Sequence, residues 1–143
     1  MKSGEGTLLR SVVLLALALT ACGKTLDELS TEQRKASWAA ANVYPGDYRA
    51  ELMAYLRTYL NDPTGIREAA ISEPALKPAG AGDRYVVCVR FNPKRSGGGG
   101  YAGLKDHLVI YAGGKLDRYL ENAGESCKDA AYTAFPELER ITR

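Results

Sequence analysis

The strongest helical pattern in the chain covers residues 47–61 and ends before a proline. Apolar side chains recur there at spacings of three and four residues, which places them on one face of a helix. They are Tyr48, Leu52, Tyr55, Leu56, Tyr59 and Leu60. Asp47 is a favourable residue type for the N-cap. We expect an amphipathic helix whose tyrosine rings pack on a sheet with their hydroxyls at the rim; the alternative is a tyrosine platform for carbohydrate or peptidoglycan.

Beyond that helix the apolar pattern changes to a period of about two, which is typical of strands. Residues 66–72 form a weakly patterned predicted strand, and residues 85–92 form the strongest one, rich in β-branched and aromatic side chains. Residues 105–112 and 115–120 are predicted to form a hairpin around the Gly-Gly pair between them, because glycine readily takes the positive φ of a tight turn.

Glycine and proline mark two predicted loops, over residues 74–82 and 93–103. Before the strong helix, residues 31–41 consist mostly of good helix formers and follow a capping box at Ser30–Gln33. We expect a short helix there, with a loosely ordered spacer as the alternative.

The C-terminal region predicts a short helix over residues 126–134 and a charged, frayed tail over residues 137–143. These elements together predict an α+β fold, an antiparallel meander of about four strands packed by one or two N-terminal helices and a short C-terminal helix. The expected organisation is a signal peptide over residues 1–21, a lipidated tether with a possible short helix over residues 22–46, and an α+β domain over residues 47–143.

Residues 1–21 have the character of a bacterial signal peptide. Lys2 and Arg10 supply positive charge, and residues 11–20 form an uncharged, mostly apolar run of about ten residues. A membrane-spanning helix needs roughly 20 apolar residues, so this run is too short to span. The run ends in the sequence Leu19-Thr20-Ala21-Cys22, which resembles the lipobox of bacterial lipoproteins.

The lipobox resemblance implies that Cys22 is a lipid attachment site, with diacylglycerol on its thiol, palmitate-type acyl chains and cleavage before it. Two or more acyl chains anchor a protein stably, so the resemblance implies a membrane partner through the lipid. Gly23 stands where enterobacterial lipoproteins retained in the inner membrane carry aspartate, which favours the outer membrane and its periplasmic side. An ordinary secretory signal that contains a cysteine is the alternative.

Length and charge limit the remaining function classes. The chain has 19 Lys+Arg and 17 Asp+Glu among 143 residues. Removal of residues 1–21, which contain Lys2, Arg10 and Glu5, leaves 122 residues with 17 basic and 16 acidic side chains. That length suits one domain, and the balanced charge gives no electrostatic footprint for nucleic acid.

Cys88 and Cys127 are the cysteines that remain after Cys22. Paired cysteines in an exported domain usually bridge, so we expect a disulfide. It requires Cys127 to reach an edge or the less apolar face of the 85–92 strand, where alternation places Cys88. A reactive thiol is the alternative; it needs a base, and the only histidine, His107, is expected at the surface or rim.

No motif in the sequence specifies catalysis, a metal or a cofactor. Gly98, Gly100 and Gly103 match the spacing G-x-G-x-x-G, but a dinucleotide site needs a helix after the third glycine, and a strand is predicted there. One histidine and two cysteines expected to bridge do not make a zinc site, and no carboxylate pair is specified. The sequence leaves enzyme activity undecided and favours a non-enzymatic role.

Basic, polar and aromatic residues gather in and beside the loop over residues 93–103. The candidate binding residues are Arg90, Asn92, Lys94, Arg95 and Tyr101. Successive glycine amides beside cations can form an anion-binding nest, so the candidate partners are an anionic ligand or an acidic envelope protein. A solvated hairpin tip is the alternative.

Two segments of the chain carry a recognisable pattern: the turn Asp62-Pro63-Thr64-Gly65, and the stretch from Cys88 through Asn92 to Gly103. They resemble a set of small proteobacterial envelope proteins of unknown function, with the pattern D-P-x-S followed by C-x3-N-x-K-N-S-x-G-G-Y-x-G. Gly65 replaces the usual serine, Arg95 replaces the usual asparagine, and one extra residue stands among the glycines. The resemblance implies a small α+β envelope domain whose loop is its functional edge.

These observations favour a non-enzymatic binding or scaffold module of the cell envelope. An inhibitor of an envelope hydrolase and a small hydrolase are the alternatives. The sequence does not identify the partner.

Overall fold

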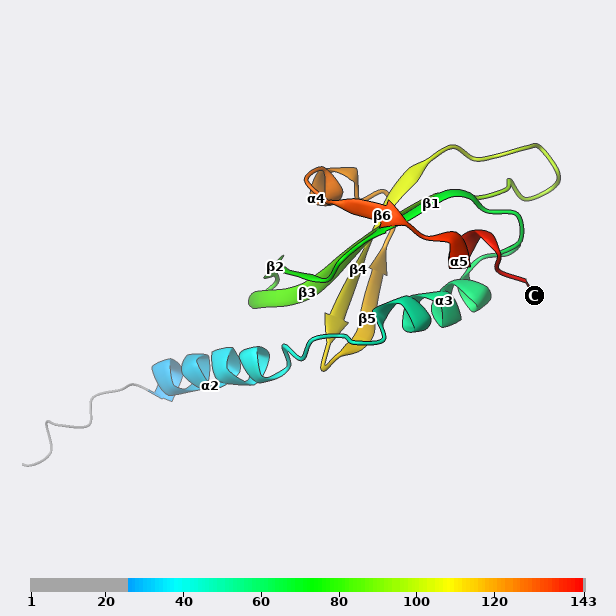
Figure 1. The fold of residues 1–143 in the computed structure, drawn as a ribbon. Helices are drawn as coiled ribbons and strands as arrows, with labels where there is room; N and C mark the ends of the chain where they lie inside the picture. Colours follow the sequence, from blue (N-terminus) through cyan, green and yellow to red (C-terminus); the bar gives the residue numbers. More distant parts are fainter. Residues whose placement is uncertain (1–25, 143) are drawn as a thin grey trace, which may run out of the picture. The chain divides into compact units, whose positions relative to one another are not determined.

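The computed structural model describes residues 26–142 (Figure 1). The predicted signal peptide and Cys22 lie outside the described residues. The chain divides into two units after Arg34. The first unit contributes the start of helix α2 (Leu26–Ala40), and the second contains the sheet and its helices. No helix within residues 26–142 is long and apolar enough to cross a bilayer.

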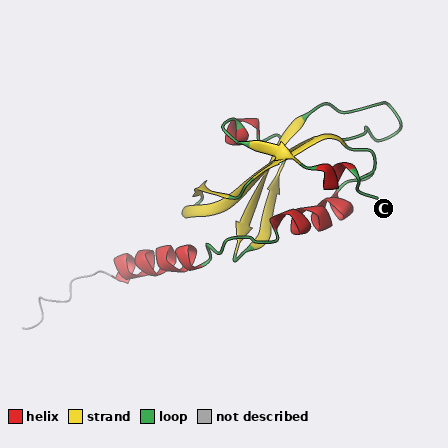
Figure 2. Cartoon of the chain, in the orientation of Figure 1, coloured by secondary structure: helices red, strands yellow, loops and turns green. Residues whose placement is uncertain are grey.

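The second unit is built on an antiparallel sheet, in which strand order runs β5-β4-β3-β1-β6 (Figure 2). The strands are β1 (Arg67–Ser72), β2 (Ala75–Ala79), β3 (Gly82–Asn92), β4 (Lys105–Ala112), β5 (Lys115–Leu120) and β6 (Tyr132–Ala134). β3 is long enough to pair with β2 along its first half and with β1 along its second half. The predicted α+β class and the predicted strands are confirmed, and the sheet contains two strands more than expected.

The prediction of a loop over residues 74–82 is wrong, because β2 lies within it. Its residues pair with β3 from Ala75 opposite Val86 to Ala79 opposite Gly82. Pro78 is tolerated because β2 pairs with β3 alone, and a proline on an edge strand can point its missing N–H outward.

The predicted C-terminal helix over residues 126–134 is also wrong. The structure has a one-turn helix α4 (Gly124–Cys127), then β6, then a second short helix α5 (Pro136–Glu139). β6 takes the free edge of β1, and the backbone N–H of Phe135 donates to the carbonyl of Ala69 at 2.8 Å. The tail beyond β6 is not frayed, since Leu138 and Ile141 are buried in the core.

Helix α3 (Tyr48–Tyr59) confirms the predicted amphipathic helix, and Asp47 occupies its N-cap without a side-chain capping bond. Helix α2 begins earlier than predicted. Ser30 lies inside it and its hydroxyl donates to the carbonyl of Asp27 at 2.8 Å, so Ser30–Gln33 does not act as a capping box.

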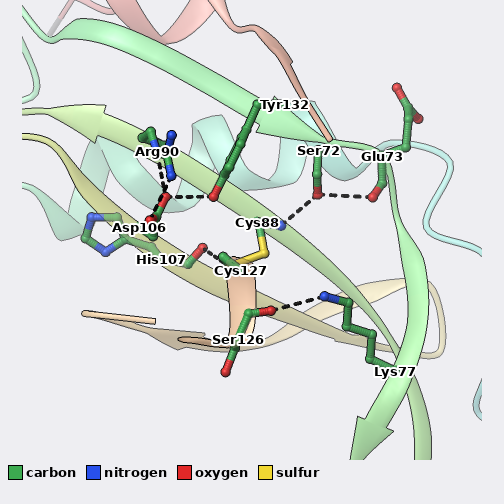
Figure 3. Close-up of a disulfide and its surroundings, with 10 residues drawn as sticks. All are labelled: Ser72, Glu73, Lys77, Cys88, Arg90, Asp106, His107, Ser126, Cys127 and Tyr132. Carbon is green, nitrogen blue, oxygen red and sulfur yellow. Dashed lines mark hydrogen bonds and ion pairs between the residues drawn. A yellow bond between two sulfur atoms is a disulfide. The ribbon is translucent and has the colours of Figure 1, made fainter. Parts of the chain in front are cut away.

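The two faces of the sheet carry separate cores. On one face Val87, Val89 and Phe91 of β3 pack with buried residues of α3 and of the C-terminal segment. On the other face Cys88 joins a smaller cluster with Leu108, Ile110 and Cys127. Cys88 and Cys127 form a disulfide there (Figure 3), which confirms the expected pairing. α4 therefore brings Cys127 to the second face, as the alternation of β3 required.

The far end of this second face is covered by the last turn of α2. The Trp38 indole N–H donates to the carbonyl of Asp83 at 2.9 Å, and the Arg84 guanidinium lies 3.6 Å from the centre of the indole ring. Arg84 also donates to the carbonyl of Trp38 at 2.6 Å, and this carbonyl at the helix end accepts from the Ala41 N–H at 3.3 Å as well. A Cβ at Gly82 would lie 2.7 Å from Trp38 Cδ1, so any other residue here would displace the indole ring. Residues 35–40 are thus a docked helix and not a loose spacer.

The disulfide generates a first prediction. It closes a loop with a sequence separation of 39 residues, and the chain-entropy cost of such a loop predicts a loss of about 4 kcal/mol in unfolding free energy on removal. We expect the double variant Cys88→Ala/Cys127→Ala to show this loss in urea denaturation. Reductant should reproduce it in the wild-type chain and have no effect on the variant. A wild-type midpoint that reductant does not move would contradict the prediction.

Candidate functional site

The loop after β3 is a short hairpin that extends beyond the ends of β3 and β4 (Figure 1). Lys94 and Tyr101 form an isolated antiparallel bridge. The Arg95 N–H donates to the carbonyl of Gly100 at 2.8 Å, and the Ala102 N–H donates to the carbonyl of Pro93 at 2.9 Å. Gly97 and Gly98 close the turn with φ of 88° and 84°, a conformation that favours glycine. The predicted loop is therefore a defined finger whose backbone bonds fix its base.

Two of the candidate binding residues hold the finger to Gly65 and to the start of β1. The Tyr101 hydroxyl donates to the carbonyl of Gly65 at 3.1 Å, and the guanidinium of Arg67 lies 4.1 Å from the centre of the Tyr101 ring. The Asn92 amide donates to Glu68 Oε2 at 3.1 Å, and its oxygen accepts from the Gly103 N–H at 2.9 Å. Tyr101 and Asn92 therefore position the finger.

Lys94 and Arg95 are the two candidate residues that present charge to solvent. Both are exposed, and within the described residues neither side chain takes part in a hydrogen bond or an ion pair. They face the turn that follows α3, where Asp62 Oδ1 accepts from the Thr64 N–H at 3.0 Å and from the Thr64 hydroxyl at 2.6 Å. The finger and this turn form opposite walls of a depression.

The depression consists of two adjoining hollows, which we call the tip hollow and the helix-end hollow. The tip hollow, about 470 Å³, lies between the finger tip and Asn61 and Asp62. The helix-end hollow, about 340 Å³, lies between the finger base and Tyr59 and Glu121. Both are lined by Asn61, Asp62, Lys94 and Ser96, so they form one continuous loop groove.

Arg90 is not part of this groove. Strand alternation places it on the disulfide face, where it makes a bidentate ion pair with Asp106, at 2.6 Å and 3.0 Å (Figure 3). The Tyr132 hydroxyl also donates to Asp106, at 2.7 Å, and the guanidinium of Arg90 lies 4.4 Å from the centre of the Tyr132 ring. The hydrogen bonds from Arg90 hold the pKa of Asp106 below its ordinary value. Arg90 therefore anchors β6 to the sheet and lies outside the lining of the loop groove.

The two tyrosines Tyr55 and Tyr59, which the sequence analysis placed on one face of the helix, form an aromatic stack with Tyr119, which it did not foresee. Tyr55, Tyr59 and Tyr119 lie with ring centres 5.1–5.2 Å apart. The Tyr59 hydroxyl donates to Glu121 Oε1 at 2.6 Å, which raises the pKa of Tyr59 to about 12. Tyr59 remains 42% exposed. The helical spacing indicates the first two tyrosines, but only the pairing of β4 with β5 brings Tyr119 to them.

His107 extends the same stack into the core, although it is expected at the surface or rim from sequence. Its ring stacks between Phe91, 4.7 Å away, and Tyr119, 5.2 Å away. The residue is 5% exposed, and neither ring nitrogen has a hydrogen-bond partner among the described residues. Burial lowers the pKa of His107 below its ordinary value, because the charged imidazolium loses its hydration.

The described residues contain no group of three or more His, Cys, Asp or Glu that could hold a metal ion. Cys88 and Cys127 are joined in the disulfide, so neither is a free thiol. What the loop groove offers chemically is a set of exposed cations, amide and carboxylate oxygens, and one aromatic face.

Comparison with known proteins adds no family or fold assignment. No protein-family model, no curated protein and no solved structure matches the chain significantly.

The burial of His107 generates a pH prediction. The pKa of His107 is lower in the folded chain than in the unfolded chain, so the unfolded chain binds the proton more readily. The folding free energy that depends on neutral His107 is therefore lost as pH falls below about 6.5. Glu121 and Asp106 oppose the depression, while Lys105 adds to it. We expect the urea midpoint to fall more steeply between about pH 8 and about pH 5 in the wild type than in His107→Gln, which does not titrate there. Parallel pH profiles for the two chains would refute this assignment.

Proposed function

We propose that this protein is a lipid-anchored envelope module that binds a partner through the loop groove, without carrying out catalysis. The observation that carries the proposal is the pair of exposed, unpaired cations, Lys94 and Arg95, on a finger with a fixed base. Function commonly resides in loops that a rigid scaffold positions. Here the scaffold is the sheet, and Tyr101 and Asn92 supply the fixation.

The ordered base of the finger lowers the conformational entropy that is lost when a ligand binds. A mobile loop loses conformational entropy when it captures a ligand, whereas a loop that is already ordered loses less. Four hydrogen bonds at the base of the finger, to Pro93, Gly100, Gly65 and Asn92, already restrict it. Lys94 and Arg95 are then available to an acceptor without first breaking an internal ion pair.

The lipid anchor is the second part of the proposal, and it rests on the lipobox resemblance at Cys22. The last turn of α2 supports the anchor, because it packs on the sheet through Trp38. A chain tethered at Cys22 would then be attached to the sheet at a defined point. The disulfide is consistent with an oxidising compartment outside the cytoplasm.

The groove is tested with the mature chain immobilised and exposed to solubilised envelope components. We expect saturable capture in the wild type and a loss of about tenfold or more in affinity for Lys94→Gln/Arg95→Gln, because charge-assisted hydrogen bonds are the strong ones. The melting temperature should hardly change, since both side chains are exposed and unpaired.

The matched control is Arg118→Gln/Lys128→Gln, which removes the same charge. Arg118 of β5 is paired with Ile110 and lies 3.4 Å from Asp117, and Lys128 follows α4; neither residue lines the groove. Equal loss of binding in both double variants would indicate a nonspecific charge effect and would argue against the groove.

The anchor is tested by substitution of Cys22. We expect the wild-type protein to incorporate labelled palmitate in its bacterial host and to enter the detergent phase, and Cys22→Ser to lose both properties. Cys88→Ser/Cys127→Ser should keep the label, because the disulfide cysteines do not carry lipid in this proposal. Labelling of the Cys22→Ser chain would exclude the anchor at that residue.

A further inference from the structure

The two hollows of the loop groove differ in chemistry. Lys94 and Asp62 line both hollows. The tip hollow adds Arg95 and the exposed glycines of the finger turn, so positive charge predominates there. The helix-end hollow adds Tyr59 and Glu121, so it presents an aromatic ring and a further carboxylate. A ligand that fills the whole groove must therefore carry an acidic group at one end and hydrogen-bond donors at the other.

Tyr59 supplies a flat apolar surface at the helix end. Its ring is stacked on Tyr55 at 5.1 Å with an interplanar angle of 19°, and it contacts Tyr119 at 5.1 Å. The bond from its hydroxyl to Glu121 fixes the ring from the other side. A ring held in this way loses little freedom on binding, and its exposed part can cover a ligand face made of C–H groups.

The polar rim around Tyr59 suits hydroxyl donors. A carboxylate such as that of Glu121 accepts hydrogen bonds and has about four lone-pair sites. Glu121 Oε1 uses one of these for Tyr59. An aromatic face with such a rim matches a pyranose, which has C–H groups on its faces and hydroxyls around its edge.

In the tip hollow, Lys94 and Arg95 favour the binding of a carboxylate. A guanidinium and an ammonium without internal partners gain charge-assisted hydrogen bonds from an acidic group. Glu121, which lines the helix-end hollow alone, would repel that group there, and Arg95, which lines the tip hollow alone, would attract it, so these two charges set the direction of the ligand. A neutral sugar leaves the two cations unused, and a free phosphate gains nothing from Tyr59.

We propose that the loop groove binds a carboxylate-bearing saccharide, with a sugar ring on Tyr59 and the acidic group between Lys94 and Arg95. This inference rests on the proposed function and gives its ligand a chemical class. The predicted envelope location points to the glycan of peptidoglycan as a source, because muramic acid carries a lactyl carboxylate on an otherwise neutral amino-sugar backbone.

The test uses the mature ¹⁵N-labelled chain and three probes: the disaccharide of N-acetylglucosamine and N-acetylmuramic acid, neutral di-N-acetylchitobiose, and inorganic phosphate. We expect the acidic disaccharide to shift the amide resonances of residues 59–62, 94–101 and 121, and to bind at least about tenfold more tightly than chitobiose. Phosphate should bind more weakly and leave residue 59 unaffected.

Variants separate the two ends of the groove. Lys94→Gln/Arg95→Gln should bring the acidic disaccharide down to the affinity of chitobiose, while Arg118→Gln/Lys128→Gln should change neither. Tyr59→Ala should weaken both sugars, and Tyr59→Phe, which keeps the ring, should weaken them less. The amide spectrum of each variant reports whether it remains folded.

Three results would overturn the inference: chitobiose binding as tightly as the acidic disaccharide, phosphate binding as tightly as the disaccharide, or shifts confined to residues outside the groove. Failure of the saccharides combined with charge-dependent capture of an envelope component would remove the ligand class and leave the binding module in place. Failure of both experiments would remove the proposed function as well.

Discussion

The backbone pairing of β3 decides where nearly every other element lies. Its eleven residues pair with β4 along one edge and with β2 and then β1 along the other. Because side chains alternate across a strand, the same pairing assigns Val87 and Val89 to the main core and Cys88 to the opposite face. The loop groove begins where β3 ends, so its position follows from the length and register of this strand.

The opposite face shows how a small domain covers a second surface with few residues. A single turn of helix brings Cys127 onto Cys88, and the ion pair of Arg90 with Asp106 continues the covered area towards β6. At the far end Trp38 lies on Gly82 and Arg84. The main face contains the larger core, with α3 and the C-terminal segment. The disulfide and the cation–aromatic contacts therefore replace a second hydrophobic layer.

The loop groove combines parts that come from three separate stretches of the chain. The end of α3 supplies Tyr59 and the Asp62 turn, the finger supplies Lys94 and Arg95, and the segment after β5 supplies Glu121. The aromatic stack through Tyr119 and His107 connects the groove to the main core. Because His107 is buried and Tyr55 and Tyr119 are half-buried, the stack holds the exposed Tyr59 ring at the surface without a dedicated loop.

The sequence by itself determined the elements whose patterns are local. Apolar spacing indicated α3, alternation and β-branched residues indicated β1, β3, β4 and β5, and the two cysteines indicated the disulfide. Other features depended on partners distant in sequence. β2 contains proline and is followed by glycines, yet it forms a strand because β3 offers it a backbone edge. β6 and α5 could not be predicted from their short, polar segment. The edge of β1 that pairs with β6 and the pocket that takes Leu138 exist only after the sheet has formed. In the same way, Arg90 and Lys94 are equally basic in sequence, and only the tertiary structure pairs Arg90 with Asp106 and leaves Lys94 facing the groove.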